Sequence, residues 1–180
     1  EDGFLGRHPA ESTRAHQMVY ENSLRMIDSD AASAFDLSKE PQKVREAYGK
    51  GMFGQGCLLA RRLVERGVPF VEVNFGGWDL HQNCFTGLQQ RLPEVDQAMS
   101  ALVEDLAASG LLDDTIVLWM GEFGRTPRIN GDAGRDHWAR SWSVVAGGGG
   151  LAGGKVIGAT SDDGTAVTTE PYSSEDLMST

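Results

Sequence analysis

The stretch TIVLWMGEFGRTPRINGDAGRDHW, residues 115–138, decides the fold that we predict for this chain. It begins with a short apolar run, Thr115 to Met120, which is rich in β-branched residues and predicts a strand buried on both faces. Charged and imidazole side chains follow closely: Glu122, Arg125, Arg128, Arg135, Asp136 and His137. Such groups just past the carboxyl end of a buried strand are typical of a ligand site in an open α/β sheet. The alternative is a loop held together by ion pairs.

A second strand and a long helix precede this stretch. Residues 68–75, VPFVEVNF, indicate a strand. Residues 88–110 predict a helix, with Pro93 in its first turn and Gly110 at its end. The apolar positions of this helix recur every three or four residues: Leu88, Leu92, Val95, Met99, Leu102 and Leu106. A strand–helix–strand unit of this length predicts a right-handed crossover between parallel strands.

Parallel strands share a carboxyl edge, and this brings distant polar residues together. Asp79 and His81 follow the first strand, and Glu122 and Arg125 follow the second. The loop after Arg125 is short enough to fold back, which brings His137 over the same edge. We therefore expect Asp79, His81 and His137 to approach within the reach of a shared metal ion.

Carboxylate oxygens and imidazole nitrogens together suit zinc, manganese or iron. A catalytic metal keeps an open position, where it polarises an ester oxygen or lowers the pKa of a bound water. In the alternative interpretation, Asp79 caps the following helix and His137 donates to a backbone carbonyl. Arg125 offers two parallel donors to a phosphate, sulfate or carboxylate group. It could equally pair with Glu122 or Asp136.

The remaining segments predict helices before this unit and short strands after it. Helices are predicted over residues 12–27, 30–35, 41–49 and 53–66. Strands are predicted over residues 142–146 and 155–159, and a polar hairpin or loop over residues 161–170. The glycines of residues 147–154 precede neither Gly-Lys-Ser/Thr nor a GxGxxG helix start, so we interpret them as a flexible turn rather than a phosphate cradle.

Composition limits the partners and the class of protein. The chain has 180 residues, which suffices for one domain with a core. Its formal net charge is -10 and its basic residues are scattered, which argues against nucleic acid or an anionic membrane as the main partner. No apolar run reaches the ~20 residues of a transmembrane helix. Cys57 and Cys84 form no zinc pattern. The sequence begins at Glu1 without a signal peptide, and we expect it to be part of a longer protein.

A nucleophile is harder to identify than the metal ligands. Thr126, Ser141 and Ser143 have no nearby base in the sequence, and no GxSxG motif is present. If the protein is a hydrolase, the nucleophile lies outside this chain or metal-bound hydroxide serves instead.

Several long motifs carry a family resemblance: GGWDLHQN at 76–83, GEFGRTPRIN at 121–130, GRDHW at 134–138 and GGKVIGAT at 153–160. They resemble the bacterial sulfatase-like family called domain of unknown function 1501, over nearly the whole chain. The resemblance places residues 1–180 in the C-terminal part of a longer alkaline phosphatase-like domain. It implies a three-layer α/β/α sandwich with a mainly parallel sheet and a metal site at the strand ends.

The same resemblance suggests which residues bind metal. Asp79 and His81 resemble the first Asp and His of the superfamily pattern, Glu122 resembles the carboxylate of the second pair, and His137 resembles the late histidine. Phe123 stands where the partner of that carboxylate would be, so we expect Glu122 to lie several ångströms from the others. The implied cofactor is a divalent metal, namely zinc, manganese or calcium.

The function implied by the resemblance is metal-dependent hydrolysis of a sulfate or phosphate ester. For this function we predict Arg125 as the catalytic residue, because its parallel donors would bind the oxyanion. The substrate would be a small molecule or a polysaccharide, and the setting periplasmic or at the cell surface. The alternative is a non-catalytic relative that keeps the fold to bind a ligand or partner. Phe123 favours the alternative, and the retained Asp79, His81, Glu122 and His137 oppose it.

Overall fold

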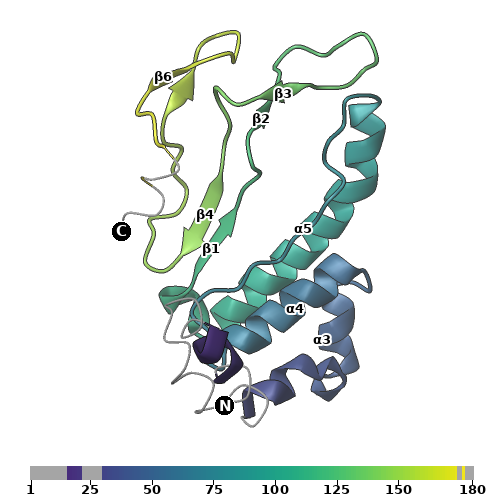
Figure 1. Cartoon of the computed structure of the whole chain (residues 1–180), viewed down its shortest axis with the longest axis vertical. Coiled ribbons are helices and arrows are strands. Elements are labelled where there is room, and N and C mark those ends of the chain that lie inside the picture. The colour runs from purple at the N-terminus through teal and green to yellow at the C-terminus, as the bar shows by residue number, and fades with distance from the viewer. Residues whose placement is uncertain (1–15, 22–29, 174–175, 177–180) are drawn as a thin grey trace, which may run out of the picture.

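The computed structural model of the chain describes residues 16–21, 30–173 and 176, and it has a mixed α/β fold (Figure 1). The helical elements are η1 (Asp30–Phe35), η2 (Leu37–Lys39), α3 (Gln42–Ala47), α4 (Met52–Val64), α5 (Cys84–Ala108) and η3 (Leu111–Asp114). The strands are β1 (Ile116–Trp119), β2 (Gly124–Arg125), β3 (His137–Trp138), β4 (Val145–Gly148), β5 (Ala159–Thr160) and β6 (Val167–Thr169). They form two-stranded antiparallel sheets.

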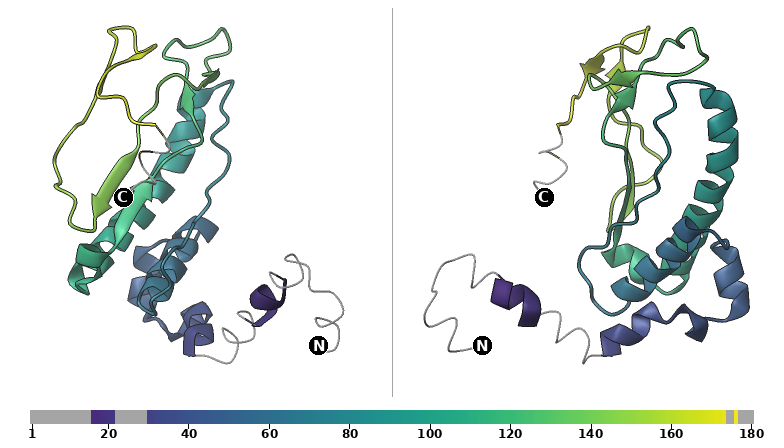
Figure 2. Two further views of the ribbon diagram at one scale, coloured as in Figure 1. Left: turned by 60° about the vertical axis from the view of Figure 1, so that its left-hand side comes forward. Right: turned by 45° about the vertical axis from the view of Figure 1, so that its right-hand side comes forward.

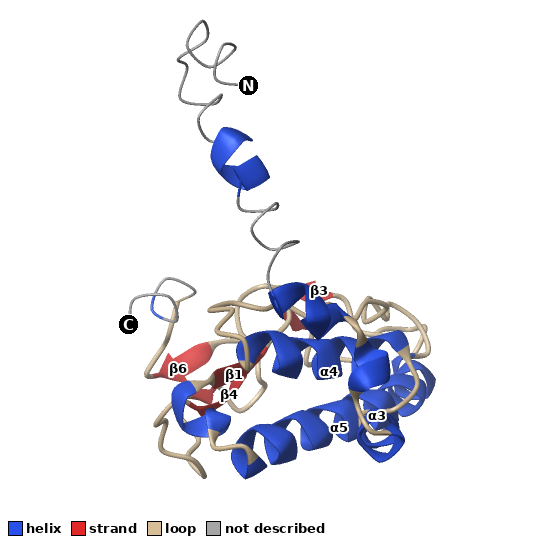
Figure 3. Cartoon of the chain, turned by 90° about the horizontal axis from the view of Figure 1, so that it is seen from below, coloured by secondary structure: helices blue, strands red, loops and turns tan. Residues whose placement is uncertain are grey.

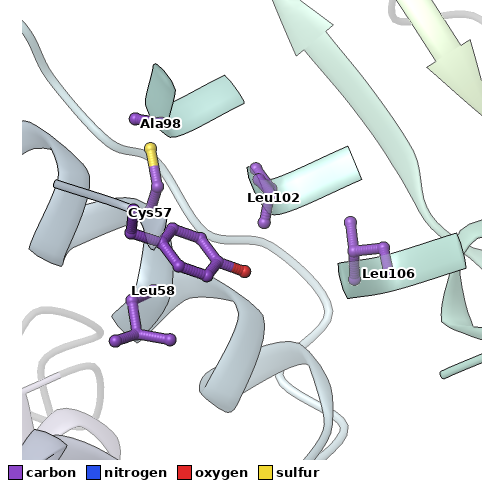
Figure 4. Packing of buried hydrophobic residues seen from close by; sticks show 6 residues of the cluster. Cys57, Leu58, Ala98, Leu102 and Leu106 are labelled. Carbon is purple, nitrogen blue, oxygen red and sulfur yellow. The ribbon is translucent and has the colours of Figure 1, made fainter. Parts of the chain in front are cut away.

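The core lies where α4 packs along α5 (Figure 3). Apolar residues at helical spacing bring one face of each helix together. The buried cluster contains Tyr48, Cys57, Leu58, Ala98, Leu102 and Leu106, most of which Figure 4 shows at close range. The predicted helices over residues 30–35, 41–49, 53–66 and 88–110 are therefore confirmed in kind, although α5 begins earlier, at Cys84.

Two arginines of α4 anchor the segment that precedes it. Arg61 and Arg62 are 7% and 4% exposed, and both guanidinium groups bind the carboxylate of Glu40. Arg62 also donates to the backbone oxygen of Ala34 at 2.7 Å. Burial raises the pKa of Glu40, but the hydrogen bonds from Arg61 and Arg62 outweigh it, so the pKa is lowered overall. The ionised carboxylate is thus part of the folded state.

The predicted parallel strand pair is wrong for the described residues. β1 pairs antiparallel with β4, with Ile116 opposite Gly148 and Trp119 opposite Val145. Residues 68–75 are extended but form no strand. They attach through side chains instead, because Phe75 stacks on Phe53 of α4 with ring centroids 4.7 Å apart. A right-handed crossover of paired parallel strands is therefore not formed.

Residues 68–75 and β1 nevertheless run in the same direction, as the predicted strand–helix–strand unit requires. Figure 1 shows residues 68–75 and β1 both running from the lower part of the view toward the upper part, with α5 returning between them. The right-hand view of Figure 2 shows the same arrangement, with α5 on one side and the strands on the other. The segments that follow residues 68–75 and β1 therefore reach the same end of the molecule.

Two details of the predicted unit are also wrong. β1 is not buried on both faces, since Ile116 is 58% exposed and Leu118 is 41% exposed, whereas Val117 packs toward the core. The reason is that α5 covers only one face of the β1–β4 sheet in the described part of the chain. Pro93 lies inside α5 rather than in its first turn, and Leu92 beside it is 43% exposed.

The C-terminal strands differ from the predicted ones mainly in their boundaries. The strand predicted over residues 142–146 corresponds to β4 and lies slightly later, and that predicted over 155–159 is reduced to β5. The polar hairpin over residues 161–170 is confirmed by the pairing of β5 with β6. Of the helix predicted over residues 12–27, only residues 16–21 are described, and these are helical. None of the described helices is both long and apolar enough to cross a membrane.

Candidate metal centre

The candidate site lies at the end of the molecule where α5 begins and β2 and β3 pair (Figure 1). β2 and β3 are antiparallel, with Arg125 directly opposite His137. Asp79 and His81 belong to the segment that leads into α5. Two parts of the chain that are distant in sequence thus supply the polar groups of one site.

Hydrogen bonds tie the loop over residues 126–136 to the segment before α5. They join Asn83 N to Asp132 O (2.9 Å), Cys84 N to Ala133 O (2.9 Å), Arg135 N to Leu80 O (3.0 Å) and Asn130 Nδ2 to His81 O (2.9 Å). Gly134 lies so close to this segment that a Cβ atom there would be 1.9 Å from His81 O. Only a residue without a side chain fits, so the loop backbone determines where His81 lies.

Three side chains converge at this end. Nε2 of His81 and Nε2 of His137 each lie 2.9 Å from Oδ1 of Asp79. The two ring nitrogens are 3.3 Å apart. Ligand atoms that are ~2.05 Å from one metal ion are separated by roughly 2.9 Å at a right angle and by roughly 3.3 Å at the tetrahedral angle. The spacing of Asp79, His81 and His137 therefore fits a shared metal ion, and these residues form an exposed group that could hold one.

The other ring nitrogen of His81 also has a partner. His81 Nδ1 lies 2.8 Å from Oδ1 of Asp136. An ionised carboxylate only accepts hydrogen bonds, so Nδ1 carries the hydrogen, and Nε2 of the neutral ring has a free lone pair. That lone pair belongs to the atom facing Asp79 and His137.

Both carboxylates of the site are ionised at neutral pH. The hydrogen bonds from Arg125 and then His137 lower the pKa of Asp79 to about 2. The hydrogen bonds from His81 and then Asn130 lower the pKa of Asp136. Both side chains are solvent-exposed, so these interactions shape the charge of the site more than they stabilise the fold.

Arg125 pairs most closely with Asp79, a partner that the sequence did not suggest, and forms a longer ion pair with Glu122, which it did suggest. Its Nη1 donates to Asp79 Oδ1, while its Nη2 lies 3.7 Å from Oε1 of Glu122. Glu122 is 68% exposed and does not join the group of Asp79, His81 and His137. Asp79 does not cap α5 either, because Asn83 occupies the N-cap position.

Sequence reasoning missed the residues that support the histidines. The sequence indicates Asp136 as a charged residue and a candidate partner of Arg125, and nothing in the pattern GRDH indicates that it meets the ring of His81. Phe123 packs against His137 with ring centroids 4.6 Å apart, so this residue contacts the site although it cannot bind metal. Asn130 also supports the site, and its only signal in the sequence is that a side-chain amide within a Gly-rich loop commonly orders backbone turns.

No nucleophile with an adjacent base is evident among the hydroxyl groups singled out in the sequence. Ser141 is 8% exposed, and its hydroxyl donates to Gly164 O at 3.0 Å. Thr126 Oγ1 donates to Arg128 O and accepts from Asp136 N. Both hydroxyl groups are used to hold loops together, and the described part of the chain pairs neither with a histidine.

The comparison with known proteins gives one match. A family model described as "Protein of unknown function (DUF1501)" matches residues 1–180. No curated protein and no solved structure matches the chain. The family description names no activity, substrate or cofactor, so the chemistry of the site follows from its geometry and from the motifs in the sequence.

Proposed function

The chain belongs to the DUF1501 family, and we propose that it supplies the metal-binding part of a metal-dependent hydrolase of sulfate or phosphate esters. The observation that carries this proposal is the convergence of Nε2 of His81, Nε2 of His137 and Oδ1 of Asp79, separated by 2.9–3.3 Å. Three protein ligands leave coordination positions open, as catalytic metal sites require.

The donor set favours a transition metal. Two imidazoles and one carboxylate suit zinc, manganese or iron, whereas calcium is bound by oxygen ligands. The proposed ligands are Asp79, His81 and His137. Glu122 is not proposed as a ligand of the same ion in this conformation, because its carboxylate faces Arg125 and solvent.

Arg125 and a bound cation together could bind an oxyanion such as a sulfate or phosphate group. When bound, a divalent cation would polarise an ester oxygen and stabilise the negative charge that develops there. Arg125 touches the same carboxylate as both histidines, so its guanidinium lies where it can bind a non-bridging oxygen of a sulfate or phosphate group. The side chain of Arg125 is 22% exposed, so it remains accessible from solvent.

The wider assignment rests on the motif resemblance. We propose an alkaline phosphatase-like α/β/α sandwich for a longer domain, in which further strands extend the sheet and the nucleophile is supplied from outside this chain. The exposed apolar side chains of Ile116 and Leu118 support a further layer on β1. The proposed substrate is an ester of a small molecule or polysaccharide, and the proposed location is the periplasm or cell surface.

Calorimetric titration with Zn²⁺ and Mn²⁺ tests the metal centre. We expect one ion per chain, with binding lost in Asp79→Ala and in His137→Ala. His16→Ala is the matched control, because His16 is an exposed histidine in a different part of the chain. Failure of the unaltered chain to bind either ion, or equal loss in the control, would overturn the proposal.

Hydrolysis is tested on the natural full-length protein with nitrophenyl sulfate and nitrophenyl phosphate. We expect turnover that a chelator abolishes, that added metal restores and that His137→Ala removes. Metal binding without turnover of either ester would instead favour the non-catalytic alternative, in which the domain only binds a ligand or partner.

A further inference from the structure

We propose that Asp136 is a positioning residue that fixes the ring of His81 for metal binding. This inference rests on the proposed metal centre. Asp136 Oδ1 accepts from His81 Nδ1 at 2.8 Å, so the opposite ring nitrogen presents its lone pair toward Asp79 and His137. A carboxylate behind a metal-binding histidine selects the tautomer, holds the ring orientation and raises the basicity of the ligand atom.

Asp136 is itself held in place. Asn130 Nδ2 donates to Asp136 Oδ1 at 3.2 Å, and the backbone N of Asp136 donates to Thr126 Oγ1 at 3.0 Å. The amide of Asn130 cannot turn over without loss, because its oxygen accepts from the backbone N atoms of Asp132 and Gly134. Its NH₂ group must therefore face Asp136 and the carbonyl of His81.

The position of Asp136 excludes it as a ligand of the same ion in this arrangement. Its carboxylate bonds to Nδ1 of His81, and the proposed metal would bind at Nε2, on the other edge of the ring. Within the described part of the chain, the acidic and histidine residues that converge on one point are Asp79, His81 and His137, without Asp136. Asp136 therefore acts through His81.

The two histidines are supported in different ways. His81 has the carboxylate of Asp136, whereas His137 packs against the ring of Phe123 at 4.6 Å between centroids. A change at Asp136 should consequently alter one ligand of the metal and leave the other two in place.

The simpler interpretation is an ordinary surface ion pair. The side chains of His81 and Asp136 are 44% and 52% exposed, and pairs at such positions contribute little to stability. An ordinary pair and a positioning contact differ in one consequence, because only the positioning contact should change metal affinity and the ligand field while leaving folding stability unaltered.

Co²⁺ binding to the full chain is the test, measured by titration and by the visible absorption spectrum of the bound ion. In Asp136→Asn we expect affinity about 10- to 100-fold weaker than in the unaltered chain and an altered absorption spectrum. Asp136→Glu, which restores a carboxylate, should recover part of the affinity. The thermal midpoint of each variant should stay close to that of the unaltered chain.

Asp132→Asn is the matched control, because Asp132 lies in the same loop and its contacts are made by its backbone. It should bind Co²⁺ as the unaltered chain does. Unchanged affinity and spectrum in Asp136→Asn would overturn the inference and leave the metal centre intact. Complete loss of binding, as in Asp79→Ala, would overturn it by making Asp136 a ligand. Absence of Co²⁺ binding by the unaltered chain would refute the metal centre and this inference together.

Discussion

Nε2 of His81 lies 3.3 Å from Nε2 of His137, and each of these atoms is 2.9 Å from the same oxygen of Asp79. The hydrogen bond from Nδ1 of His81 to Asp136 leaves its Nε2 without a hydrogen in the neutral ring. The hydrogen bond between His137 Nε2 and Asp79 Oδ1 at 2.9 Å helps to hold these atoms together. A bound cation would take the place of that hydrogen and accept lone pairs from all three atoms.

The α4–α5 interface should be sensitive to loss of side-chain volume. Leu102 and Leu106 are 9% and 1% exposed, so Leu102→Ala and Leu106→Ala should each lower the free energy of unfolding by ~2–5 kcal/mol. Leu92→Ala is the control, since Leu92 is on the same helix but 43% exposed. Urea titration measures all three variants. A loss below about half a kcal/mol in Leu106→Ala would show that this packing is wrong.

Gly134→Ala should move the loop over residues 126–136 away from the segment before α5 that carries Asp79 and His81. A Cβ atom at this position would lie 1.9 Å from the carbonyl oxygen of His81, so the loop must move away from the segment before α5. We expect metal affinity to fall at least tenfold, since the hydrogen bonds that hold the loop against His81 are lost at the same time. Gly131→Ala is the matched control, because a Cβ there would meet no atom within 4 Å. Equal affinities in Gly134→Ala and Gly131→Ala would contradict the docked loop.

Low pH should weaken the ion pairs between Glu40 and the two arginines of α4, Arg61 and Arg62. The pKa of Glu40 is lowered in the folded protein from its ordinary value of 4.5, with burial opposing the arginine hydrogen bonds and the hydrogen bonds prevailing. The resulting stabilisation is therefore complete above about pH 4.5 and is lost as the pH falls through the lower folded-state pKa.

The measurement is urea unfolding at pH 7 and at successive values below pH 4.5. Glu40→Gln should be less stable at pH 7 by about 3 kcal/mol, because it removes the carboxylate that pairs with buried Arg62. Arg61 also loses this partner but keeps its ion pairs with Glu65 and Asp105. It should also show a smaller decrease in stability with acid. Parallel pH profiles for the two proteins would rule out this role for Glu40.

Without a nucleophile from elsewhere, the 180-residue chain should not turn over nitrophenyl sulfate or nitrophenyl phosphate. The hydroxyl groups of Ser141 and Thr126 are bonded to backbone oxygens, and neither is paired with a base. Colorimetric assay with added metal measures this directly. Metal-dependent hydrolysis by this chain that disappears in His137→Ala would contradict the prediction.

The sequence predicted the positions of the proposed ligands better than it predicted the sheet. The apolar repeat that includes Leu102 and Leu106 correctly indicated a long helix that reverses the chain direction between residues 68–75 and β1. That reversal alone brings Asp79 and His137 to one end, so the convergence holds although the strands are not paired. The partner of each strand could not be predicted, because backbone hydrogen bonds between strands leave no pattern in the side-chain sequence. In the structure β1 pairs with β4 and not with residues 68–75.

The support of His81 could not be predicted for a different reason. Asp136 and Asn130 reach the ring and its backbone because the loop turns sharply at Ala133, which has a positive φ of 56°. Non-glycine residues rarely adopt this conformation, and no periodicity in the sequence indicates it. Contacts made by irregular loops depend on such individual backbone angles, whereas helices can be read from repeated side-chain spacing.

Anomalous diffraction from crystals grown with Zn²⁺ shows most directly whether Asp79, His81 and His137 bind one metal ion. We expect an anomalous peak ~2.0–2.2 Å from Nε2 of His81, Nε2 of His137 and a carboxylate oxygen of Asp79. The peak should disappear in crystals of Asp79→Ala that diffract to similar resolution. Crystals with Zn²⁺ bound elsewhere, or with no ion between the two imidazoles, would show that these three residues do not form the metal centre.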